Sequence, residues 1–172
     1  MRMELFGPQS EMLIRLTVAV ILGLVLGAER TRVGKRAGMR TYALVSLGAA
    51  LFIVIAGMVS FQYADTFIFD PLRVASQIVV GMGFLGAGVI FVQRQELTGL
   101  TTAAGLWVVA GIGMACGYGF YTIATYVTFL MLLVFEVMWY IEEHFIRLDR
   151  SEIKKESITD SRKHKQHNED ES

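Results

Sequence analysis

The sequence predicts an all-α integral membrane protein with about five transmembrane helices, its N-terminus outside the membrane and its C-terminus in the cytoplasm. Of its 172 residues, 53% are hydrophobic and only 19% are charged. The charged residues are concentrated outside a few long apolar runs, so the formal net charge of zero hides an uneven distribution. We therefore expect one polytopic membrane domain over residues 1–141 and a charged, partly disordered cytoplasmic tail over residues 142–172.

Four apolar runs define the expected transmembrane spans. They cover residues 12–28, 42–60, 74–92 and 101–141. As a single helix the last run would be roughly 60 Å long, which is twice the thickness of the hydrocarbon core of a bilayer. Gly117-Tyr118-Gly119 lies inside this run and can form a turn. We therefore divide the run into two spans, at about 101–116 and 120–141.

Basic residues beside the spans predict their orientation. Five Lys or Arg residues lie between residues 30 and 40, after the first span, and seven lie in the tail. The positive-inside rule favours the cytoplasmic side for both groups. Five spans place them on the same side, whereas four spans would place the basic tail outside. The loop 61–69, which has no Lys or Arg, lies outside in the five-span arrangement.

The first span carries small residues at helical spacing. Arg15, Ala19, Gly23 and Gly27 recur every four residues. The Gly23-x3-Gly27 spacing lets two helix backbones approach closely, either within the chain or between chains. Arg15 lies near the expected outer end, where its long side chain can reach the membrane interface.

The inner end of the first span is charged. Glu29 and Arg30 end the apolar run, and several basic residues follow them. An acidic side chain in such surroundings is expected to be paired, and Arg36 and Arg40 are the candidate partners of Glu29.

The third span has a distinct start and a polar face. Asp70 is expected to cap the helix, with Pro71 at its first position. Arg73, Gln77 and Gly81 follow at intervals of four, so they share one face, and Asp70 can pair with Arg73. The same helix carries further glycines, at Gly83, Gly86 and Gly88. Two interpretations stay open: a polar groove that leads from outside to a glycine-lined contact, or a capped helix with a structural ion pair and tight packing.

Two glycine-containing segments need separate interpretation. GMGFLG, residues 81–86, has the letters of a dinucleotide-binding loop, but that loop requires a preceding strand and a tight turn. These glycines lie in the middle of an apolar span, so we expect no nucleotide or nucleic-acid partner. The segment 99–104, GLTTAA, begins the fourth span at the inner face, and Thr101 or Thr102 can cap that helix.

Catalytic and metal-binding signatures are weak in this sequence. No Ser/His/Asp, Cys/His or metalloprotease pattern occurs, so we expect no catalytic residue and a protein that is not an enzyme. All three histidines lie in the tail, and HKQH, residues 164–167, is a weak metal pattern with few other ligand types nearby. We therefore predict no metal site and no cofactor.

Four blocks of the sequence together resemble the membrane domain of the MgtC/SapB family of bacterial inner-membrane proteins. The blocks are GLVLGAER (23–30), AGMRT (37–41), DPLRVASQIVVGMGFLGAGVI (70–90) and GLTTAAGLWVVAGIGMACGYGFY (99–121). The resemblance implies about five transmembrane helices in the bacterial inner membrane and a link to growth under magnesium limitation and, in some pathogens, to survival inside host cells. Some members of the family also carry a soluble C-terminal domain, for which this tail is too short and too polar.

The resemblance also assigns motif residues to this chain. By resemblance, the functional motif comprises Glu29, Arg30, Arg40, Thr41, Asp70, Arg73, Gln77, Thr101 and Thr102. The residues expected to serve helix packing are Gly23, Gly27, Gly81, Gly83, Gly86 and Gly88.

Three functions are compatible with these features. The leading hypothesis is a non-enzymatic protein that lies in the lipid bilayer and acts by helix–helix association with itself or with another membrane complex. The alternative is a small transporter of magnesium, protons or a solute, with Asp70, Arg73 and Gln77 lining an outer vestibule. A third hypothesis is a sensor of lipid head groups that uses the basic loop 30–40.

Overall fold

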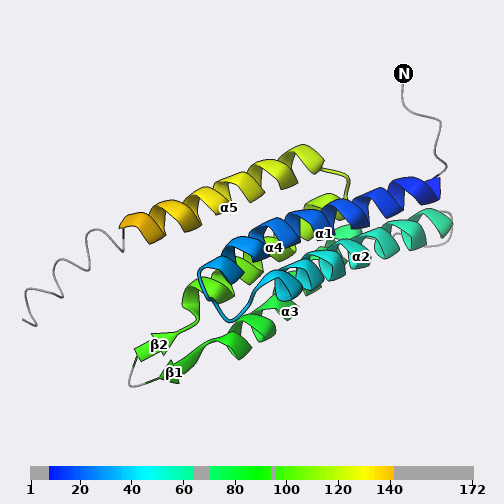
Figure 1. Ribbon diagram of the computed structural model, residues 1–172. Helices are drawn as coiled ribbons and strands as arrows, with labels where there is room; N and C mark the ends of the chain where they lie inside the picture. The colour runs from blue at the N-terminus through cyan, green and yellow to red at the C-terminus, as the bar shows by residue number, and fades with distance from the viewer. Residues whose placement is uncertain (1–7, 64–69, 94–95, 142–172) are drawn as a thin grey trace, which may run out of the picture. The chain divides into compact units, whose positions relative to one another are not determined.

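A computed structural model describes residues 8–63, 70–93 and 96–141 (Figure 1). In chain order the elements are α1 (Pro8–Arg32), α2 (Met39–Gln62), α3 (Pro71–Val89), β1 (Phe91–Gln93), β2 (Glu96–Thr98), α4 (Leu100–Gly117) and α5 (Tyr121–Ile141). All five helices are long and apolar enough to cross a membrane. The prediction of a five-helix membrane protein is confirmed, and the orientation remains a prediction from the positive-inside rule. The predicted tail lies outside the described residues.

Glycines in the left-handed region end two of the helices. After α1, the Gly34 N–H donates to the Thr31 carbonyl and the Lys35 N–H to the Arg30 carbonyl. This pair of bonds is a Schellman motif, and Gly34 has the positive φ of 69° that it requires. The same motif closes α4, where Gly119 has a φ of 82°. This second turn separates α4 from α5 inside the long apolar run.

α2 packs against both α1 and α4, and glycines make these contacts close. A Cβ on Gly23 would lie 2.8 Å from the Tyr42 carbonyl oxygen, and one on Gly27 would lie 2.5 Å from the Met39 Cα. On the α4 side, a Cβ on Gly113 would collide with the Ser46 carbonyl oxygen. No side chain larger than hydrogen fits at these positions, so helix backbones are in direct contact.

α3 is far more exposed than α4. Only 6% of the Leu72–Val89 span is buried inside the protein, compared with 56% of Leu100–Gly117. α3 contacts mainly α4 and touches α2 only lightly. The protein by itself therefore leaves most of α3 uncovered.

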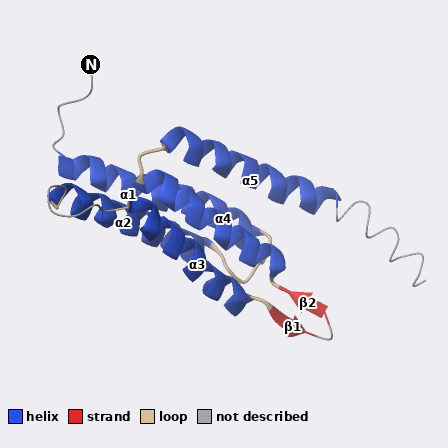
Figure 2. Ribbon diagram, turned by 180° about the vertical axis from the view of Figure 1, so that it is seen from behind, coloured by secondary structure: helices blue, strands red, loops and turns tan. Residues whose placement is uncertain are grey.

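A short antiparallel hairpin joins α3 to α4, which the sequence did not lead us to expect (Figure 2). The third span was predicted to continue to Val92, but α3 ends at Val89, and Phe91 pairs with Thr98 across the hairpin. Phe, Val and Thr favour strands, and a run of polar residues follows Val92, which explains why the helix stops here.

The chain divides into two compact units. The first extends to Leu132 and contains α1 to α4, the hairpin and the first part of α5. Of the second, which starts at Leu133, the structure describes the last part of α5.

Gly113→Ala tests the contact between α2 and α4. Because the new methyl group would collide with the backbone of α2, we expect a loss of about 1–3 kcal/mol in the free energy of unfolding. Gly111→Ala is the matched control, since nothing lies within 4 Å of a Cβ at that position. Denaturant titration in mixed micelles measures both. Equal stabilities of the two variants would contradict the close contact.

Candidate functional site

A buried ion pair lies at the inner end of α1. The Arg30 guanidinium donates to both carboxylate oxygens of Glu29, through Nε to Oε2 and through Nη2 to Oε1 at 2.7 Å. Glu29 is 8% exposed and Arg30 3% exposed. Removing two charges from water is costly unless each satisfies the other, and this bidentate geometry does so.

Glu29 was expected to be paired, and it is, but the predicted partners were wrong. Its partner is the adjacent Arg30 rather than Arg36 or Arg40. The Arg36 guanidinium lies over the ring of Phe91, 4.0 Å from its centre, and Arg40 is exposed in the first turn of α2. Spacing along a helix gave no reason to expect a bidentate pair between neighbouring residues.

Two further polar groups are buried on α2 near this pair. Tyr42 and Ser46, one turn apart, are both fully buried. Tyr42 is close enough to feel the charges of Glu29 and Arg30. Among the described residues, neither hydroxyl has a hydrogen-bond partner, which is unusual for buried polar atoms. Neither residue was predicted, because an isolated Tyr or Ser in an apolar run carries no pattern.

The opposite end of the molecule carries a second polar group. Arg15 donates from Nη1 to the Gly117 carbonyl at 2.9 Å and forms an ion pair with Glu11 at 2.7 Å. The expectation that Arg15 reaches the membrane interface stays a prediction; within the protein, Arg15 satisfies one of the free carbonyls at the C-terminus of α4.

Asp70 caps α3 as predicted, and its carboxylate accepts a hydrogen bond from the Leu72 N–H at 2.9 Å. The predicted ion pair with Arg73 is absent from the described part of the chain, where Arg73 is exposed. Burial, and secondarily the Asp70 carboxylate, raise the pKa of the Tyr118 phenol above its usual value. Asp70 therefore lies near the C-terminal end of α4.

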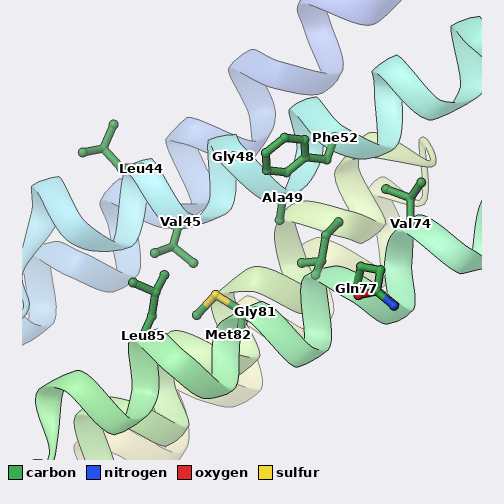
Figure 3. Close-up of a pocket in the computed structure, with 11 residues that line it drawn as sticks. Leu44, Val45, Gly48, Ala49, Phe52, Val74, Gln77, Gly81, Met82 and Leu85 are labelled. Atoms are coloured by element: carbon green, nitrogen blue, oxygen red, sulfur yellow. The ribbon is translucent and has the colours of Figure 1, made fainter.

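A groove separates α2 from α3 (Figure 3). Its volume is about 580 Å³, and its lining is apolar except for the amide of Gln77. Leu44, Val45 and Phe52 line it on α2, and Gly81 and Leu85 line it on α3 together with Gln77. The groove is thus an apolar recess with a single amide group near one end.

The glycines predicted to serve helix packing fall into two groups. Gly23 and Gly27 contact the backbone of α2. A Cβ on Gly86 would lie 3.7 Å from the Ala103 methyl carbon, which is ordinary van der Waals contact. Nothing lies within 4 Å of the corresponding position on Gly81, Gly83 or Gly88. Among the residues that the structure describes, nothing packs closely against the second group.

A second recess lies at the inner end, beside the hairpin. It has a volume of about 520 Å³ and includes Lys35, Arg36 and the start of α4. Thr101 and Thr102 were expected to cap α4, but the cap residue is Gly99, which has no side chain to accept a hydrogen bond. Thr101 is exposed and Thr102 is buried. Thr41 is half-buried on α2.

Comparison with known proteins identifies the family. Residues 16–144 match the model of the MgtC family. The chain belongs to the MgtC family. It is similar to YhiD of Escherichia coli (strain K12), named "Putative magnesium transporter YhiD", with 45% identity over 130 residues, 74% of this chain and 60% of that protein. It is also similar to Protein MgtC of Salmonella typhimurium (strain LT2), with 44% identity over 120 residues, 70% of this chain and 49% of that protein.

The chain spans about half to three fifths of the length of these relatives. No solved structure is significantly similar to it. Family membership and the five apolar helices establish a multi-pass membrane protein related to magnesium-associated relatives. Within the described residues, no group of three or more His, Cys, Asp or Glu side chains is placed to hold a metal ion.

Glu29→Gln tests the buried ion pair. The substitution leaves the buried Arg30 charge without its counter-ion, so we expect the free energy of unfolding to fall by about 3–5 kcal/mol. Glu11→Gln is the matched control on the same helix, because it removes the exposed partner of Arg15. We expect it to cost less than about 1 kcal/mol. Comparable losses in mixed-micelle denaturation would show that the Glu29–Arg30 pair is not buried.

Proposed function

We propose that this chain is a non-enzymatic protein of the bacterial inner membrane that acts by helix–helix association through α3. The observation that carries this proposal is the uncovered face of α3, where Gln77, Gly81 and Gly88 are all exposed. Gly23 and Gly27 on α1 and Gly113 on α4 are already in contact with α2, whereas nothing among the described residues lies within 4 Å of a Cβ position on Gly81, Gly83 or Gly88 of α3. Van der Waals packing at small residues is the main force that joins helices in a bilayer.

A second copy of this chain is the partner we propose. Residues 77, 81, 84 and 88 lie on one stripe of α3, because they are spaced by three and four. An amide both donates and accepts hydrogen bonds, so Gln77 can pair with Gln77 of a second copy across a twofold axis. An exposed amide within an apolar span is costly against lipid, and this pairing would satisfy it. The family resemblance links the protein to growth under magnesium limitation, and we propose that the assembly acts in that process.

Disulfide crosslinking in membranes tests association through α3. Phe84→Cys, placed on the exposed stripe in a Cys116→Ala background, should form a dimer on mild oxidation. Ile21→Cys on α1, which is also exposed, is the control and should not. Adding Gly81→Leu should reduce the Phe84→Cys dimer at least about tenfold, because a bulky side chain separates the backbones.

Gly57→Leu controls for bulk, since it also has open space around it but lies on α2 outside the groove. If the dimer yield is the same in the Gly81→Leu and Gly57→Leu backgrounds, self-association through α3 is wrong. A Phe84→Cys crosslink to a different membrane protein, in place of the dimer, would transfer the proposal to that partner and overturn the homodimer.

Ion transport is the second candidate function. The name of YhiD describes magnesium transport for that protein, and the polar groups of Tyr42 and Ser46 are buried without partners among the described residues. These buried hydroxyls are the groups that a transported ion or proton would contact, although among the described residues no group of three or more His, Cys, Asp or Glu is placed to hold a metal ion.

Flux assays in proteoliposomes test transport. If the protein carries magnesium or protons, flux should saturate and should fall at least about fivefold in Tyr42→Phe, which removes a single hydroxyl. In the same assay, Asp70→Asn tests whether Asp70 lines an outer vestibule on the path of the ion. No flux above that of empty liposomes, from protein with an unchanged circular dichroism spectrum, would exclude transport of these ions by the protein alone.

A further inference from the structure

The recess beside the hairpin has the composition of an anion site. It is formed by the loop after α1, the end of α3, the hairpin and the first turn of α4. The described residues that line it include Lys35, Arg36, Phe91, Leu97, Leu100 and Thr102. Among the described lining residues, Lys35 and Arg36 are cationic and none is acidic. The lining therefore combines positive charge with an apolar wall.

The first turn of α4 adds backbone donors to this recess. The first N–H groups of a helix have no carbonyl partner within the helix, and they carry a partial positive charge. Gly99 supplies no side-chain cap for them. A Cβ at Gly99 would collide with the Val89 carbonyl oxygen, and its φ of +93° also favours glycine. The packing of α3 against this turn thus requires a residue that leaves the N–H groups uncapped.

Thr102 provides an independent indication of a ligand. It is only 7% exposed and lines the recess. Among the described residues its hydroxyl has no hydrogen-bond partner, in contrast to the Thr98 hydroxyl, which donates to the Phe91 carbonyl at 3.2 Å. The Thr102 oxygen is not one of the fully buried polar atoms, so an acceptor in the recess can reach it.

The basic side chains are positioned to act together. Lys35 follows directly on the Schellman turn that ends α1. The Arg36 guanidinium is held over the Phe91 ring at 4.0 Å, which limits its freedom and favours binding of an anion. Ammonium, guanidinium, helix N–H and hydroxyl groups are all donors, and phosphate oxygens accept from every one of them.

We propose that this recess binds a phosphate group, supplied by an anionic phospholipid head group at the inner membrane surface. The positive-inside rule places the loop 30–40 at that surface, and the apolar side of the recess, with Leu97 and Leu100, suits the glycerol and acyl part of a lipid. A free phosphate offers the same oxygen chemistry without the apolar part. The site does not depend on self-association through α3.

Calorimetric titration of the full-length protein in neutral detergent tests the site. The probes are dioctanoyl phosphatidylglycerol, dioctanoyl phosphatidylcholine, glycerol 1-phosphate and inorganic phosphate. We expect phosphatidylglycerol to bind at least about tenfold more tightly than phosphatidylcholine, because only the former keeps a net negative charge for two cations. Saturable binding of inorganic phosphate or glycerol 1-phosphate at equal or higher affinity would instead identify a soluble phosphate as the ligand and overturn the lipid source.

Thr102→Val is the decisive variant, because it removes one hydroxyl without changing charge or volume. We expect it to weaken phosphatidylglycerol binding about tenfold or more, as expected for one hydrogen bond to a charged phosphate oxygen. Lys35→Gln/Arg36→Gln should weaken binding at least about tenfold. Arg32→Gln/Arg40→Gln is the charge-matched control, since neither residue lines the recess.

Two results would overturn the proposal. One is equal weakening by the two double variants together with no effect of Thr102→Val, which would indicate only general attraction to a basic surface. The other is no binding of any of the four probes by protein whose thermal unfolding is normal. Unfolding curves of each variant separate lost binding from lost structure.

Discussion

Direct contact between the backbone of α2 and the backbones of α1 and α4 is the constraint on which the rest of this structure depends. In a bilayer, the apolar side chains of a helix gain little by leaving lipid for protein, so close packing must hold the helices together. Gly23 and Gly27 on one side and Gly113 on the other permit that packing, because any side chain would collide with the main chain of α2. α3 packs against this three-helix contact, mainly through α4.

The close contact also explains where polar groups are tolerated. Beside the α1–α2 crossing, Glu29 and Arg30 satisfy each other in a site from which both lipid and water are largely excluded. Had the helices been held apart by larger side chains, the pair would face lipid or solvent. Tyr42 and Ser46 are buried on α2, and their hydroxyls, with Arg15 Nε and the Tyr121 hydroxyl, are the buried side-chain atoms without a hydrogen-bond partner among the described residues.

The two ends of the helices that surround α2 differ in character. At one end, Arg15 supplies a cation to the carbonyls of α4, so the helix terminus is satisfied by the protein itself. At the other, Gly99 starts α4 without a side-chain cap, and Lys35 and Arg36 lie beside the same recess. α3 is left outside the tight contact, with its groove and its glycine face uncovered. The uncapped first turn of α4 and the uncovered face of α3 are therefore the surfaces where, among the described residues, backbone N–H groups and glycine positions have no partner.

The sequence by itself determined the membrane class, the five helices, the Asp70 cap and the turn that divides the long apolar run, because hydropathy, capping and glycine act over a few neighbouring residues. It also indicated the close packing of Gly23 and Gly27, whereas the contact of Gly113 with α2 was not predicted. Only the tertiary structure decided which glycines contact another helix, which residue pairs with Glu29 and which helix remains uncovered. Spacing along a helix defines a face, but which other element covers that face depends on contacts between residues far apart in the chain. The recess of Lys35, Arg36 and Thr102 exists only because a hairpin that local patterns did not predict brings these segments together.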